Sequence, residues 1–111
     1  MKIIVTGGRE YSNVDKVKSV LDSFNPDIVV HGDCRGLDRI CKAWALDNGK
    51  VQIPYPYPSQ FGKAGGPIRN KQMCTEHSDA DYLVAFKGNN GTESCVREAQ
   101  AVGLKVYRVI E

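Results

Sequence analysis

Residues 1–9 read MKIIVTGGR, an apolar run from Lys2 to Thr6 that ends at two glycines. A short apolar run followed by a turn signal is typical of a buried β-strand. Similar runs occupy residues 28–31, 51–54, 82–86 and 105–110, and segments with apolar residues at helical spacing separate them. This βαβαβαβαβ order predicts a single Rossmann-like three-layer α/β domain over residues 1–111, with a parallel sheet of about five strands.

The segments between the strands carry the start and stop signals of helices. Asn13 is a suitable N-cap for a helix over 14–24, and Asn48-Gly49 closes a second helix that starts at Leu37. Pro67 is expected at the first position of a third helix, where its missing N–H would be unpaired in any case. A fourth helix is predicted over residues 92–102, before Gly103.

Composition argues against several classes of protein. A net charge of +2 over 111 residues is too small to favour non-specific DNA binding, so we expect no nucleic-acid partner. No apolar run reaches about 18 residues, and the first run is too short for a signal peptide, so we expect a cytoplasmic protein without a membrane partner. The four cysteines form no Cys-x-x-Cys pair. We therefore expect no metal, and free thiols of which Cys41 and Cys95 pack inside helices.

Glycine placement points to a ligand site. Of the eleven glycines, nine fall between the end of a predicted strand and the first turn of the next helix. These are Gly7, Gly8, Gly32, Gly36, Gly62, Gly65, Gly66, Gly88 and Gly91. In a parallel sheet such loops share the carboxyl edge, where open α/β sheets bind ligands, and each leads into a helix N-terminus that favours phosphate. The alternative is that these glycines only form tight turns.

We expect ligand contacts from all four loops. The candidate ligand-binding residues are Gly7, Gly8, Arg9, His31, Gly32, Arg35, Gly36, Asp38, Lys63, Gly66, Arg69, Asn70, Gly88, Asn89, Asn90, Gly91 and Thr92. Arg69 falls in the first turn of a helix, where a cation opposes the helix dipole unless an anion binds there. Asp38 is expected either to bond a ribose hydroxyl or to brace the neighbouring loop. Tyr55, Tyr57 and Phe61 are candidates for stacking on a base or for core packing.

The first glycine loop does not form a known cofactor motif. Thr6-Gly7-Gly8-Arg9 is not Gly-x-Gly-x-x-Gly, and no acidic residue ends the second strand to hold a ribose. A Walker A motif is absent from the sequence as well. We therefore predict neither an NAD site nor a P-loop, and no cofactor.

Four stretches, taken in order, resemble the YspA-like branch of the SLOG superfamily. They are Thr6-Gly7-Gly8-Arg9, His31-Gly32 through Gly36 with Asp38, Gly62-Lys63 to Gly66-Pro67 with Arg69-Asn70, and Gly91-Thr92. That superfamily is Rossmann-like and is named partly for the Lonely Guy enzymes. The resemblance implies a nucleotide or nucleotide-derived ligand at the carboxyl edge. It also implies a link to nucleotide signalling and to conflict between bacteria and phages.

One departure from the superfamily bears on catalysis. Lonely Guy enzymes carry Pro-Gly-Gly-x-Gly-Thr-x-x-Glu, and Cys95 stands at the position of their catalytic Glu. A thiol, with an unperturbed pKa near ~8.5, lacks the charge of a carboxylate at neutral pH. Asp38 and Glu93 are the first candidates for a catalytic residue, and Asp33 and Glu98 are further substitutes for the missing Glu.

The leading hypothesis is therefore a binding protein, a sensor of or a sponge for a signal such as a nucleotide, an ADP-ribose-like compound or a cyclic nucleotide. The alternative is a nucleoside-phosphate N-glycosidase or a related nucleotide hydrolase. A third class is a partner-binding module with an empty pocket. Small SLOG proteins are often dimers by resemblance, and a short chain gains core by pairing, so we predict a homo-oligomer, most simply a two-fold dimer.

Overall fold

The computed structural model describes residues 1–111 and contains one parallel, five-stranded sheet. The strands are β1 (Lys2–Thr6), β2 (Ile28–His31), β3 (Val51–Pro54), β4 (Tyr82–Ala85) and β5 (Val106–Arg108). They lie in the order β3-β2-β1-β4-β5, with Ile4 of β1 opposite both Val30 and Leu83. The predicted Rossmann-like α/β fold is confirmed.

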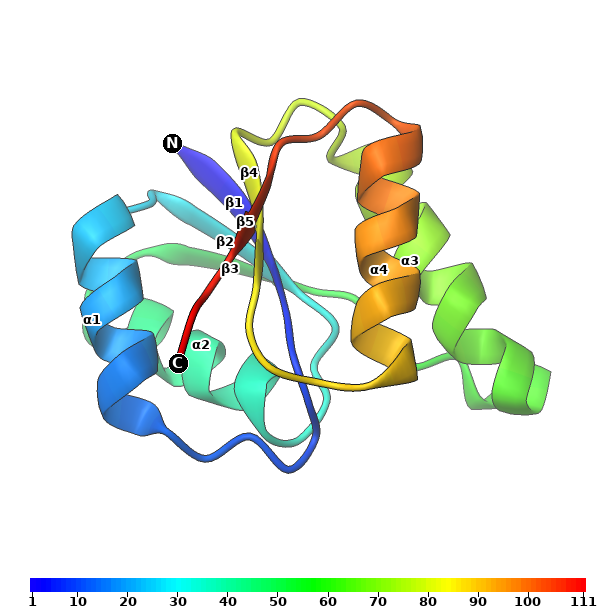
Figure 1. Ribbon diagram of the computed structural model, residues 1–111, viewed down its shortest axis with the longest axis horizontal. Coiled ribbons are helices and arrows are strands. Elements are labelled where there is room, and N and C mark those ends of the chain that lie inside the picture. The colour runs from blue at the N-terminus through cyan, green and yellow to red at the C-terminus, as the bar shows by residue number, and fades with distance from the viewer.

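Four helices form the outer layers. The helices α1 (Val14–Phe24) and α2 (Leu37–Asp47) cover one face of the sheet, and α3 (Gly65–Glu76) and α4 (Asn90–Ala101) cover the other, as Figure 1 shows. Neighbouring residues of β1 point to opposite faces, so Ile3 joins the core under α1 and α2 while Ile4 joins the core under α3 and α4. Both residues are fully buried, as expected for a parallel sheet covered on both sides.

Helix α1 has the start, buried face and end that its sequence predicts. The Asn13 side chain accepts a hydrogen bond from the N–H of Lys16, which satisfies one free donor of the first turn. Val17 and Leu21 are fully buried against the sheet. Asn25, at φ 47°, closes the helix in the left-handed region.

Three boundaries differ from the sequence prediction. Strand β5 is shorter than 105–110, because it is an edge strand paired only with β4, which itself ends at Ala85. Helix α4 begins at Asn90 rather than Thr92, so Thr92 lies inside the first turn and Asn89 is the N-cap. Helix α3 begins at Gly65, which places Pro67 at its third residue, still in the first turn where no N–H is needed.

The segment before α3 is a short 3₁₀ helix, η1 (Ser59–Ala64), which the sequence had suggested only as a glycine-rich loop. None of its residues is buried, so it lacks the apolar periodicity that reveals a helix. Cys41, Cys74 and Cys95 are fully buried free thiols, which confirms the predicted packing of Cys41 and Cys95. No helix is both long enough and apolar enough to cross a membrane.

Candidate functional site

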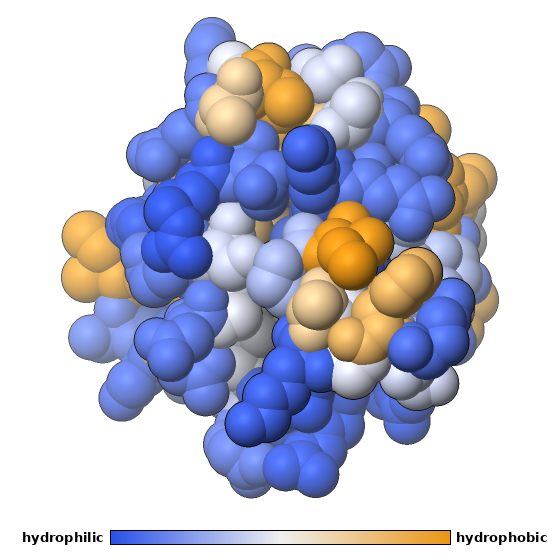
Figure 2. Space-filling view, turned by 90° about the vertical axis from the view of Figure 1, so that its right-hand side faces the viewer, coloured by the Kyte–Doolittle hydropathy of each residue, from blue (hydrophilic) through white to orange (hydrophobic).

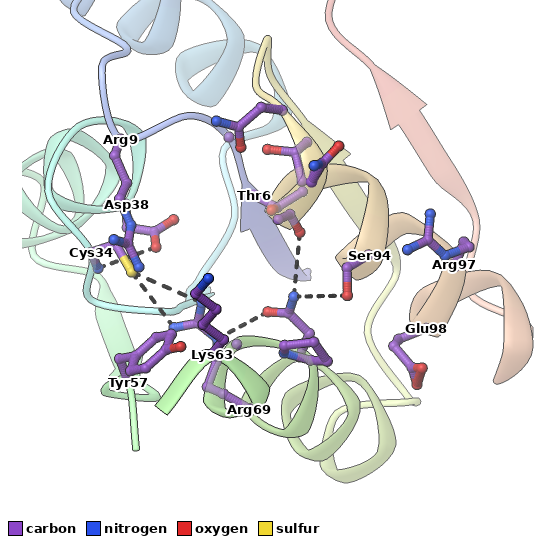
Figure 3. A pocket seen from close by; sticks show the side chains of 18 residues that line it. Thr6, Arg9, Cys34, Asp38, Tyr57, Lys63, Arg69, Ser94, Arg97 and Glu98 are labelled. Atoms are coloured by element: carbon purple, nitrogen blue, oxygen red, sulfur yellow. Dashed lines mark hydrogen bonds between the residues drawn. The ribbon is translucent and has the colours of Figure 1, made fainter. Parts of the chain in front are cut away.

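A cleft of about 750 Å³ lies at the carboxyl edge of the sheet. Its walls come from the end of β1, the loops after β1, β2, β3 and β4, and the first turns of α3 and α4 (Figure 3). The candidate residues that line it are Gly7, Arg9, Asp38, Lys63, Gly66, Arg69, Asn70, Asn89, Asn90, Gly91 and Thr92. Only two of the eighteen lining residues are hydrophobic, and Figure 2 shows a mostly polar surface over α3 and α4. The cleft therefore suits a polar ligand.

The glycine loops meet through backbone contacts that leave no room for side chains. The N–H of Gly8 donates to the carbonyl of Lys87 (3.0 Å), and the N–H of Leu37 donates to the carbonyl of Gly8 (3.2 Å). Gly36 has φ +80°, and a Cβ there would lie 2.5 Å from the carbonyl oxygens of Gly8 and Arg9. Glycine at position 36 therefore lets the loops after β1 and β2 touch, which forms one wall of the cleft.

Arg69 lines the cleft, but its guanidinium is largely bound to the protein. Its Nη1 donates to the carbonyls of Gly32 (2.7 Å) and Tyr55 (3.1 Å), and its Nε donates to Oδ1 of Asn70 (2.9 Å). Asn70 in turn donates to the carbonyl of Gly91 (3.3 Å). Arg69 and Asn70 thus join the loops after β2 and β3 to the start of α4.

The N-terminus of α4 opens into the cleft. Asn89, Asn90, Gly91 and Thr92 all line it, and the N-cap Asn89 makes no side-chain hydrogen bond to the helix. Because the N–H of Glu93 is the first to find a helical acceptor, the amides of 90–92 precede the hydrogen-bonded part of α4. The Thr92 hydroxyl is buried and has no hydrogen-bond partner. This end of the cleft therefore presents unused donors.

Three of the four cations that line the cleft make neither an ion pair nor a side-chain hydrogen bond within the protein, the exception being the hydrogen-bonded Arg69. Arg9, Lys63 and Arg97 line it, and none forms a salt bridge within the protein. The guanidinium of Arg9 lies over the ring of Tyr57, 5.7 Å from its centroid. Tyr57 is the one lining residue among the three aromatic candidates. The cleft thus combines positive charge with an aromatic face.

Asp38 is the buried acid of the site. It is 7% exposed, and its Oδ2 accepts from the N–H of Cys34 at 3.2 Å. Burial raises the pKa of Asp38, while the N–H of Cys34 and the charge of Arg69 oppose that shift. Asp38 therefore both lines the cleft and braces the loop after β2.

Several candidate residues lie outside the cleft lining. His31 is fully buried, with Nε2 2.7 Å from Gln52 Oε1 and Nδ1 accepting from the N–H of Asp33. Arg35 forms an ion pair with Glu10 at the surface. Gly8, Gly32, Gly36 and Gly88 belong to the loop backbones behind the lining.

Glu93 and Cys95 on α4 do not line the cleft. Glu93 pairs with Arg108 on the outer side of the helix, at 2.9 Å. Cys95 is fully buried, and contact with the Cys74 thiol together with burial raises its pKa well above the usual range. A thiol in that state is unreactive.

The sequence did not reveal part of the lining. The lining residues absent from the predicted ligand-binding set are Thr6, Cys34, Pro67, Ser94, Arg97 and Glu98. Ser94 and Glu98 could have been found by extending the helix period from Gly91, because residues 91, 94 and 98 fall on one face of α4.

The fold and the site define a Rossmann-like domain with a polar ligand cleft at the carboxyl edge of its sheet. A family model described as "YspA, cpYpsA-related SLOG family" matches residues 1–58, and the chain belongs to this family. The resemblance found in the sequence is thereby confirmed.

Two individual proteins are similar to this chain. The gene 61 protein of Mycobacterium phage D29 is 29% identical over 116 residues, which span 95% of this chain and 93% of that protein. DNA processing protein A (DprA) from Streptococcus pneumoniae has a solved structure that superposes with a TM-score of 0.81 at 19% identity. That match covers 99% of this chain but 50% of the DprA chain, so this chain corresponds to about half of DprA. At this identity the match with DprA shows that the two proteins share a fold and shows nothing about a shared function.

Proposed function

We propose that the protein binds a phosphate-bearing, nucleotide-derived ligand in this cleft and acts as a sensor of it or a sponge for it. The observation that carries the proposal is the open N-terminus of α4, where unused amides and three unpaired cations line the cleft beside the buried, partnerless hydroxyl of Thr92. A helix N-terminus and nearby cations are the features that proteins use to hold phosphate.

The other cleft residues support a nucleotide rather than free phosphate. Tyr57 offers an aromatic ring face, and Asp38 and Glu98 offer carboxylates suited to the hydroxyl or N–H donors of a nucleoside. DprA is titled a DNA processing protein. The net charge of +2 and the acids inside this cleft favour a small ligand over a nucleic-acid strand.

Calorimetry against nucleoside monophosphates, ADP-ribose and cyclic nucleotides tests the proposal. Lys63→Ala should weaken binding by roughly 1.5–3 kcal/mol, because a charge-assisted contact to phosphate is lost. Lys16→Ala, on α1 across the sheet, is the matched control and should bind like the wild type. Absence of binding by every compound, with folded protein, would refute the proposed function.

A second candidate function is hydrolysis of the N-glycosidic bond of such a ligand. The observation that favours it is Asp38, a carboxyl in the cleft whose pKa is raised by burial, as a proton donor requires. Chromatography of the products after incubation with nucleoside monophosphates tests it. Base release that Asp38→Asn abolishes would establish the hydrolase, and release that Asp38→Asn leaves intact would exclude this role for Asp38.

A further inference from the structure

The later turns of α4 carry three polar side chains beyond the helix start that would hold the phosphate. Ser94, Arg97 and Glu98 follow Thr92 along α4 and line the cleft (Figure 3). They are separated by three and four residues, which places them on one side of the helix. Together they offer a hydroxyl, a guanidinium and a carboxylate, with Arg97 the most exposed of the three.

The two charged groups of this wall lack partners in the protein. Neither Arg97 nor Glu98 takes part in a salt bridge or a side-chain hydrogen bond, although Glu98 is half-buried. The other acid of the cleft, Asp38, accepts from a backbone N–H. A free carboxylate in a cleft with three unpaired cations is a site for hydrogen-bond donors of a ligand rather than for its phosphate.

The position of Glu98 matches the length of a nucleotide. It follows Thr92 by six residues, about 9 Å along the helix axis at 1.5 Å per residue. A phosphate held at the start of α4 would therefore place its sugar beside Ser94 and its base beside Glu98.

We propose that α4 selects a guanine base, with the Glu98 carboxylate accepting from guanine N1–H and N2–H and Arg97 donating to O6 or N7. Guanine alone among the common bases presents two neighbouring donors next to an acceptor. Adenine presents an acceptor at N1, which a carboxylate repels, and hypoxanthine lacks the amino group. This assignment rests on the proposed function.

Calorimetry with GMP, IMP and AMP tests the assignment, because the three share their sugar and phosphate. GMP should bind roughly 10- to 100-fold more tightly than AMP, with IMP between them. Glu98→Gln should weaken GMP binding roughly 10-fold without weakening AMP binding, because one amide oxygen replaces two acceptors and the charge that repels adenine N1 is removed. Asp15→Asn removes a carboxylate from α1, across the sheet, and should keep the GMP preference.

The outcomes separate the two proposals. Equal binding of all three nucleotides, or a GMP preference that survives Glu98→Gln, overturns the guanine assignment and leaves the phosphate site standing. Failure of all three to bind overturns the guanine assignment, and the proposed function is overturned as well only if ADP-ribose and the cyclic nucleotides also fail to bind. Melting curves of each variant establish that it is folded, and Glu98→Asp, which keeps the charge on a shorter side chain, should retain part of the preference.

Discussion

The guanidinium of Arg69 illustrates how a residue can belong to a site without facing its ligand. The sequence suggested that a bound anion explains a cation in the first turn of α3. The structure gives it two backbone carbonyls and the Asn70 oxygen instead. These acceptors offset the unfavourable helix dipole as an anion would.

Arg69→Lys should therefore destabilise the fold. A lysine keeps the charge but cannot reach three acceptors in different directions, so we expect the free energy of unfolding to fall by roughly 1–3 kcal/mol. Urea unfolding followed by circular dichroism measures this. An unchanged stability combined with weaker nucleotide binding would show instead that Arg69 acts on the ligand.

Thr92→Val is expected to weaken ligand binding without lowering the stability of the fold. The Thr92 hydroxyl has no hydrogen-bond partner in the protein, and valine has the same shape, so the melting temperature should not fall. Phosphate contact should be lost, which weakens nucleotide binding by roughly 1.5–3 kcal/mol. Thermal melts and calorimetry on the same sample check both halves, and wild-type affinity would remove Thr92 from the site.

His77 gives stability a pH dependence. Burial and the charge of Lys2, whose Nζ lies 3.2 Å from Nδ1, lower the pKa of His77 from 6.5. The unfolded chain then takes up the proton more readily, so the free energy of unfolding falls as pH drops through about 6.5. Denaturant midpoints between pH 7.5 and 5 should show this decline for the wild type and a shallower one for His77→Gln.

Among the elements, those with apolar periodicity were predictable and those without it were not. The short apolar runs of β1, β2 and β3 and the apolar stripe of α1 match the structure at their bounds. The 3₁₀ helix η1 escaped because it buries no residue. In α4, the first turn was readable from its glycine and asparagines, but Arg97 and Glu98 resemble ordinary surface residues until the helix face is known.

His31 shows a further limit of predicting side-chain orientation from sequence alone. A polar residue at a strand end suggested a side chain turned to the ligand. In the structure the His31 ring instead hydrogen-bonds to Gln52, because the neighbouring strand β3 places that side chain beside it. Strand neighbours are a tertiary property that local sequence does not encode.

The contact between the loops after β1 and β2 can be tested at one glycine. Gly36→Ala should destabilise by more than about 1 kcal/mol, since it adds a Cβ against two carbonyls at a positive φ. Gly49→Ala is the control, because Gly49 has φ +66° but nothing within 4 Å of an added Cβ. The loss at position 36 should exceed that at 49 in denaturant unfolding, and equal losses would show that only φ matters.

At the scale of the whole molecule, homodimer formation remains a prediction. A domain of this length buries a modest core, and pairing adds to it. Light scattering coupled to gel filtration should report twice the chain mass of 12.2 kDa. A mass of one chain at the highest soluble concentration would exclude the dimer.

The central position of β1 divides the cleft between two parts of the chain. Residues 1–58, which the family model matches, supply β1, β2 and β3 and the wall with Gly7, Arg9 and Asp38. The later residues supply the wall with Lys63, Thr92 and the inner turns of α4. Substitutions in the second half can therefore change the side chains of one cleft wall, while residues 1–58 keep the central strands and the other wall. We expect relatives to diverge in ligand choice by drift in α3 and α4, and a chimaera to inherit its ligand from the parent of its C-terminal half.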